Sequence, residues 1–183
     1  MRGMNLRRVG HFSGIAAAAA LLVACGSNGD SSEVALPAGV VGDAAPSEQA
    51  GSICSGMVRD AAEIALDEPV QGRQRAERSG DVYSCRYEFD DGMLELAVED
   101  SGSPADALLS VERLAAGPDV AERISGLGAG GFEKADGSIV LAKDEFVLTI
   151  DVTRLPETTM RGMNLRRVGH FSGIAAAAVM DCW

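Results

Sequence analysis

The alternation of apolar and polar residues predicts two β-hairpins. Between 83 and 98, every second residue is apolar on both sides of the turn sequence Asp90-Asp91-Gly92, as expected for a hairpin with one buried face. A second hairpin is predicted from a strand at 139–142, the turn Lys143-Asp144-Glu145 and a following strand. The apolar positions of that last strand are Phe146, Leu148, Ile150 and Val152.

Apolar residues spaced three and four apart predict helices on either side of the first hairpin. One helix is expected over 52–66, before Pro69. A second is expected over 103–116, with Ser103 as its N-cap and Pro104 in its first turn.

Two further stretches complete the predicted order of elements. The polar segment 71–80 is expected to be a loop, and 120–124 a short helical turn. The order is then helix, hairpin, helix and two or three strands. It favours an α+β fold, with an antiparallel sheet of four to five strands and helices packed on one face.

The first 24 residues have the three parts of an export signal. Arg2, Arg7 and Arg8 supply positive charge, an apolar run covers 15–23, and small residues precede a cut after Ala24. The ending Leu22-Val23-Ala24-Cys25 resembles the lipobox of bacterial lipoproteins. That resemblance implies that Cys25 receives a diacylglycerol group and becomes the new N-terminus. A secretory signal with a chance cysteine and an uncleaved membrane helix are the alternatives.

Lipidation would hold the protein at the extracytoplasmic face of the cell membrane. Each buried acyl CH₂ contributes about 0.8 kcal/mol, so two or three chains give stable attachment. Residues 25–50 contain Gly, Ser, Pro and scattered acids without a regular period, and we interpret them as a flexible tether. An α+β domain is expected over 51–159.

The segment Met160–Ala178 repeats Met1–Ala19 at all 19 positions. Val179-Met180-Asp181 precedes Cys182 where a lipobox needs small residues, so the second copy is not a second lipidation signal. Three interpretations of 160–183 stay open: a duplication or assembly error, a C-terminal helix, or a disordered tail. A helix would place one apolar stripe at Leu165, Val168, Phe171, Ala175 and Ala178.

Composition and charge narrow the partners. Hydrophobic residues make up 46% of the chain but aromatic residues 4%, so we expect a core built of Ala, Val, Leu and Ile. Removal of 1–24 takes away three arginines and no acid, and the formal net charge changes from −11 to −14 in the remaining 159 residues. So acidic a domain is not expected to bind nucleic acid.

The cysteines suggest one disulfide. With Cys25 lipidated, Cys54 on the first helix and Cys85 on the first strand are a plausible pair, as exported proteins favour disulfides. Pairing of Cys182 with Cys54 or with Cys85 stays open at this stage.

Catalytic and cofactor patterns are scarce. Residues 126–131 satisfy G-x-G-x-x-G, but they are expected to follow a helical segment and open a strand, which is the wrong context for a dinucleotide loop. Asp90 and Asp91 could form an acid/base pair or hold Ca²⁺, but adjacent acids beside glycine are typical of a solvated turn. After signal removal, His170 is the remaining imidazole. We expect no catalytic residue, cofactor or metal site.

Three features together resemble small actinobacterial envelope lipoproteins. They are the lipobox, the cysteine within Tyr83-Ser84-Cys85-Arg86-Tyr87, and Ile124-Ser125-Gly126-Leu127-Gly128 leading through Phe132 into the last hairpin. The resemblance covers about 52–153 and implies a PsbP-like sandwich with no established reaction. The C-terminal copy departs from this pattern.

The expected function is that of a non-enzymatic binding or accessory module of the cell envelope, anchored to the membrane through Cys25. Its partner would be an envelope protein or a small ligand. One alternative is a carrier of a lipid or small hydrophobic molecule, which needs an apolar cavity. Another is an envelope hydrolase, which needs a polar cleft with converging titratable groups.

Overall fold

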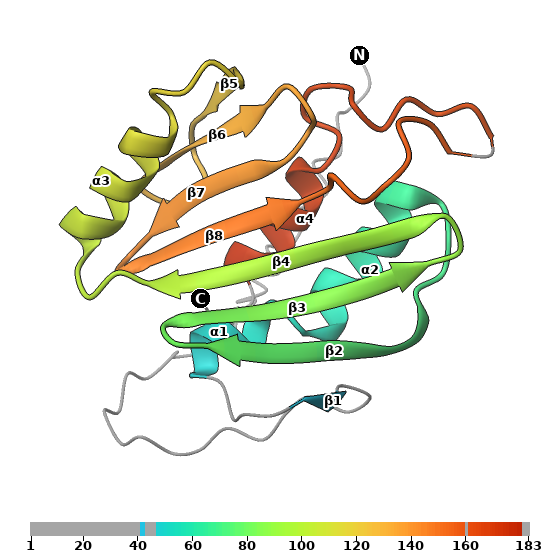
Figure 1. Cartoon of the computed structure of the whole chain (residues 1–183), viewed down its shortest axis with the longest axis horizontal. Coiled ribbons are helices and arrows are strands. Elements are labelled where there is room, and N and C mark those ends of the chain that lie inside the picture. The colour runs from blue at the N-terminus through green and yellow to red at the C-terminus, as the bar shows by residue number, and fades with distance from the viewer. Residues whose placement is uncertain (1–40, 43–46, 160, 181–183) are drawn as a thin grey trace, which may run out of the picture.

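One long sheet runs through the computed structural model, which describes residues 41–42, 47–159 and 161–180 (Figure 1). The strand order is β1-β2-β3-β4-β8-β7-β6-β5. The strands are β1 Val41–Gly42, β2 Gln71–Ser79, β3 Val82–Phe89, β4 Gly92–Asp100, β5 Val120–Ile124, β6 Gly130–Lys134, β7 Ile139–Lys143 and β8 Phe146–Asp151. Seven strands, β2 to β8, pair antiparallel, while the two-residue β1 pairs parallel with β2. The helices are α1 Glu48–Ser52, α2 Gly56–Leu66, α3 Pro104–Leu114 and α4 Ser172–Met180.

The α+β class is confirmed, but the prediction of four to five strands was wrong. The expected loop at 71–80 contains β2, and the expected helical turn at 120–124 is β5. Both strands lie at or near an edge of the sheet, and they offer little apolar surface to the core. In β2 only Gln74 and Ala76 are buried, and in β5 every residue is exposed or half-buried. Edge strands of this kind lack the apolar alternation used to recognise strands.

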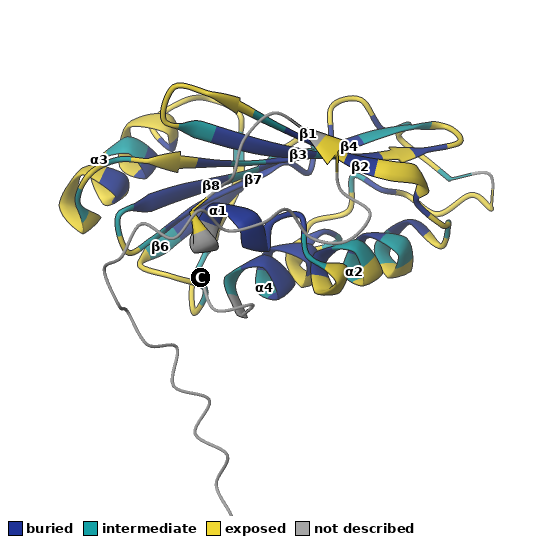
Figure 2. Cartoon of the chain, turned by 90° about the horizontal axis from the view of Figure 1, so that it is seen from below, coloured by how far each residue is buried: buried dark blue, intermediate teal, exposed yellow. Residues whose placement is uncertain are grey.

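The prediction that the helices pack on one face was also wrong. Helix α3 covers the face opposite to α1, α2 and α4 (Figure 2). Strand β7 shows the reason, because Ile139 and Leu141 belong to the larger core and Val140 and Ala142 to the core under α3. An uninterrupted apolar strand is typical of a sheet covered on both faces.

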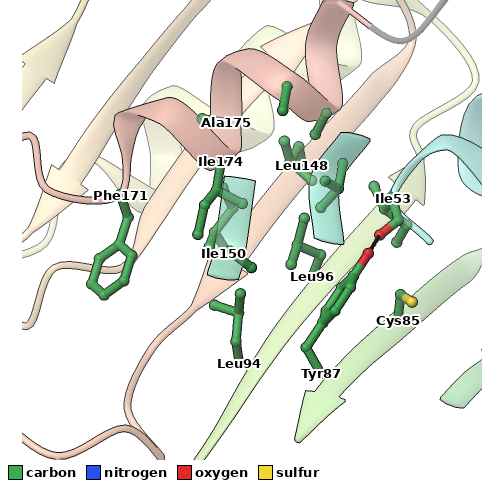
Figure 3. Packing of buried hydrophobic residues seen from close by; sticks show 14 of the residues in the cluster. Ile53, Cys85, Tyr87, Leu94, Leu96, Leu148, Ile150, Phe171, Ile174 and Ala175 are labelled. Atoms are coloured by element: carbon green, nitrogen blue, oxygen red, sulfur yellow. Dashed lines mark hydrogen bonds between the residues drawn. The ribbon is translucent and has the colours of Figure 1, made fainter. Parts of the chain in front are cut away.

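The larger core lies between the sheet and the three helices on one side of it (Figure 3). Leu94, Leu96, Leu148 and Ile150 are fully buried there, below α4. Tyr87 reaches from β3 toward the chain after α1, and its hydroxyl donates to the Ile53 carbonyl at 2.5 Å. Burial raises the pKa of this phenol well above its usual value.

The helix expected over 52–66 is broken into two. Ser55 ends the connection after α1 and caps α2, with its hydroxyl accepting from the Val58 amide. Helix α1 begins at Glu48, inside the segment expected to be a tether, and β1 pairs with β2 still earlier in the chain. The first hairpin and α3 form where they were expected.

A disulfide joins Cys54, between α1 and α2, to Cys85 on β3, with Cα atoms 5.5 Å apart. This is the pairing that the sequence favoured. Residues 1–24, Cys25 and Cys182 lie outside the described residues. Across 47–159 and 161–180, no helix combines the length and apolar character needed to cross a membrane.

Candidate binding groove

The segment 161–180, of which 161–178 repeat residues 2–19, packs on the domain through its buried residues. Helix α4 packs beside α2 and against β7, on the face opposite to α3 (Figure 2). We call residues 161–180 the C-terminal segment. We call the part of the domain that contacts it the binding groove, which includes Ala65, Asp67, Glu133, Asp136, Val152 and Leu155. Of the three interpretations of this segment, the structure has the helix, limited to Ser172–Met180.

Apolar side chains hold the C-terminal segment from the inside of the groove. Five of them have no exposed surface: Leu165, Phe171, Ile174, Ala175 and Ala178. Ile174 points from α4 toward Ile150 on β8, and Phe171, just before α4, points to the same side of the helix (Figure 3). Val168, expected on the same stripe, is 49% exposed, because α4 begins only at Ser172 and the chain before it turns.

Arg166 fixes the middle of the C-terminal segment to the domain. One guanidinium nitrogen, Nη1, donates to the Asp136 carbonyl at 2.6 Å and to the Val152 carbonyl at 3.0 Å. The other, Nη2, donates to the Leu155 carbonyl at 2.9 Å. The planar fork of arginine suits such a set of acceptors, whereas a lysine ammonium would be a single point. These acceptors come from the β6–β7 turn and from the chain after β8.

Glu133 of β6 holds the backbone at the turn before α4. Its Oε2 accepts from the Gly169 amide at 2.8 Å, while Oε1 is buried without a hydrogen-bond partner. The residue is only 2% exposed. Burial raises the pKa of this carboxyl, the Gly169 amide offsets part of that effect, and the charge of Glu122 adds to the rise.

Helix α2 supplies the other wall of the groove. The His170 Nε2 lies 2.8 Å from the Ala65 carbonyl, to which it donates, and its ring packs edge-on against Phe171 with centroids 4.8 Å apart. At the end of the same helix, Arg161 forms an ion pair with Asp67. The His170 imidazole is thus one of the contacts between the C-terminal segment and the groove.

Shallow hollows continue the groove past the end of α2. One of about 180 Å³ is lined by Leu66, Asp67, Glu68, Asp90, Thr159 and Arg161. A more open one of about 570 Å³ is lined by Asp60, Glu63, Ile64, Asp67, Glu68 and Pro69. Acidic residues are three of the six lining residues of the first hollow and four of the six of the second, where Ile64 is 80% exposed. In the first hollow, Arg161 pairs with Asp67 and offsets its charge. This end of the groove therefore combines acidic and apolar side chains.

The acidic turn singled out in the sequence borders this region. The Asp90 amide donates to Glu68 Oε1, so the turn is tied to the end of α2. In the ranges that the structure describes, no three or more His, Cys, Asp or Glu side chains are grouped to hold a metal ion.

The glycine-rich stretch 126–131 is a connection between two strands. It follows β5, where a helical segment was expected, and it opens β6, where a dinucleotide loop would open a helix. The backbone comes very close to β7 here, with the Ala129 amide donating to the Ala142 carbonyl at 2.7 Å. A Cβ on Gly128 would collide with that same carbonyl oxygen.

Sequence reasoning missed Glu133 and Arg166 as site residues. Both take their partners from chain segments far away in sequence, 36 residues for the Glu133 contact and up to 30 for the Arg166 contacts. The copied sequence was the available signal, since it set 160–178 apart. Comparisons with protein-family models, with curated proteins and with solved structures find no match to this chain.

Proposed function

We propose that the chain is an extracytoplasmic lipoprotein, anchored to the cell membrane through Cys25, whose domain is a non-enzymatic binding or accessory module. The anchor is inferred from the lipobox sequence and the segment before it. The likeness to small actinobacterial envelope lipoproteins with a PsbP-like domain belongs to the same proposal.

The observation that carries the binding role is the construction of the groove. The domain holds a basic and apolar stretch of polypeptide through backbone carbonyls, one buried carboxylate and a wall of apolar side chains. Such a combination recognises a peptide segment by its backbone and its arginines, as peptide-binding modules do. The acid-lined end of the groove favours a basic partner further.

The hydrophobic-carrier alternative needs an apolar enclosure large enough for a lipid chain. Cavities that hold such ligands measure roughly 300 to 1,000 Å³ and are mostly apolar. The two hollows past the end of α2 are open, and their linings mix carboxylates with apolar side chains. Their chemistry favours the peptide-binding hypothesis over the carrier.

The anchor is tested by fractionating cells that express the chain or its Cys25→Ala variant. The wild-type protein should sediment with membranes, and the Cys25→Ala variant should be released by mild washing. Cys182→Ala is the matched control and should stay with the membranes. Retention of Cys25→Ala would contradict the proposed anchor.

The binding role is separated from the carrier by organic extraction of the purified protein. We expect no lipid at molar ratios near one by mass spectrometry. A lipid at one copy per protein, retained through washing, would replace the binding module with the carrier.

A further inference from the structure

We propose that the binding groove also accepts the N-terminal copy, residues 1–19, which exchanges with the C-terminal segment while the leader is still attached. The ligand of the groove is then the leader of this chain. The inference rests on the proposed function, since it names the occupant of the same groove. It is carried by two observations, the described contacts of the C-terminal segment and the identity of the two copies.

Every groove contact described between 161 and 178 has an identical residue in the leader. Arg7 stands where Arg166 binds three carbonyls, and His11 stands where His170 reaches the Ala65 carbonyl. The buried apolar positions are repeated as Leu6, Phe12, Ile15, Ala16 and Ala19. Since side chains and spacing are the same, the leader can make the same contacts with the same geometry.

The connecting chain is long enough for this exchange. Residues 20–40 separate the N-terminal copy from β1, and 21 residues span up to about 70 Å when extended. A domain of this size has a radius of gyration of about 14 Å. The leader of a single chain therefore reaches the groove from either side of the molecule.

Tether length decides which copy occupies the groove. The C-terminal segment is joined to β8 by a connection of about ten residues, whereas the leader is joined to β1 by residues 20–40, about twice as many. With equal contacts, the shorter connection gives the higher effective concentration. The C-terminal segment then fills the groove in the wild-type chain, and the leader fills it when the C-terminal contacts are weakened.

The experiment uses the mature chain, residues 25–183, with the C-terminal contacts weakened by Arg166→Ala. A fluorescently labelled peptide of residues 1–19 is titrated against it, and anisotropy and the melting temperature are measured. We expect saturable binding and a melting temperature that rises with peptide concentration.

Two matched peptides make the test specific. An Arg7→Ala peptide should bind at least tenfold more weakly, because Arg7 corresponds to the residue that donates to three carbonyls. An Arg8→Ala peptide should bind like the unchanged one, because its counterpart Arg167 is exposed. Equal binding of the Arg7→Ala and Arg8→Ala peptides would overturn the proposal, and so would the absence of any rise in melting temperature.

A second variant covers the case in which Arg166→Ala does not fold. The mature Ile174→Ala chain keeps all polar contacts of the groove and loses part of one buried side chain. The same titration with the same three peptides is then decisive. Fractionation of Cys25→Ala is independent of it, so a failed anchor and a failed leader site give different results.

Discussion

Replacing Arg166 by alanine tests whether the C-terminal segment is part of the folded domain. The guanidinium donates to three carbonyls, those of Asp136, Val152 and Leu155, at 2.6 to 3.0 Å. These acceptors belong to two stretches of chain, the β6–β7 turn and the residues after β8. Truncation removes all three hydrogen bonds at once and leaves the acceptors to water.

The expected loss is about 3 kcal/mol in the free energy of unfolding. A hydrogen bond from a charged donor contributes about 1.5 to 3 kcal/mol, so three would give at most about 9 kcal/mol. Arg166 is only half-buried, however, and water can reach part of the vacated space. One group also makes all three bonds, so their contributions do not add. For a domain of this size, about 3 kcal/mol lowers the melting temperature by roughly 6 to 12 °C.

The assay is urea and thermal unfolding of the purified protein, followed by circular dichroism. Arg167→Ala is the matched control, because that neighbouring side chain is exposed, and it should change stability by less than about 0.5 kcal/mol. Arg166→Lys keeps the charge and reaches fewer carbonyls, so it should lose about half as much as Arg166→Ala. Equal stability of the Arg166→Ala and Arg167→Ala proteins would refute the docked position of the C-terminal segment.

Three further predictions concern the core and its turns. Reduction of the Cys54–Cys85 disulfide, which closes a loop of 31 residues, should lower the free energy of unfolding by about 3 to 4 kcal/mol, measured as the urea midpoint with and without reductant. Burial raises the pKa of Glu133 in the folded protein, so the folded state binds this proton more tightly than the unfolded state. The free energy of unfolding therefore falls as pH rises through and above the ordinary carboxyl range. Glu133→Gln should therefore gain stability relative to wild type between pH 4 and 7, and a pH-independent difference would contradict this. Gly128→Ala should destabilise the protein more than Gly126→Ala in thermal unfolding, because both have positive φ but only the first Cβ meets a backbone oxygen. Equal losses of stability in the two variants would show that the backbone of the connection shifts to relieve the contact.

Local patterns in the sequence were sufficient for elements that carry their own signals. The first hairpin has an alternating apolar face and an Asp-Gly turn, and α3 has a serine cap followed by proline. Both signals act between residues close in sequence. Their outcome therefore depended little on the rest of the molecule.

Elements that depend on distant partners could not be predicted in this way. Strand β2 is polar because it lies next to the edge of the sheet, and β3 supplies its pairing. The face chosen by α3 follows from burial of β7 on both sides, a property of the assembled sheet. Glu133 is recognised as a site residue only through its hydrogen bond with the Gly169 amide, which the folded chain brings next to it.

The position of α4 also sets an order of events in time. Synthesis reaches it after every other described helix and strand, yet it lies beside α2, the first long helix of the domain (Figure 1). A growing chain therefore leaves the apolar side chains under α4 uncovered until residues 161–180 have been synthesised. During that interval, residues 2–19 are already present, with the same sequence as residues 161–178.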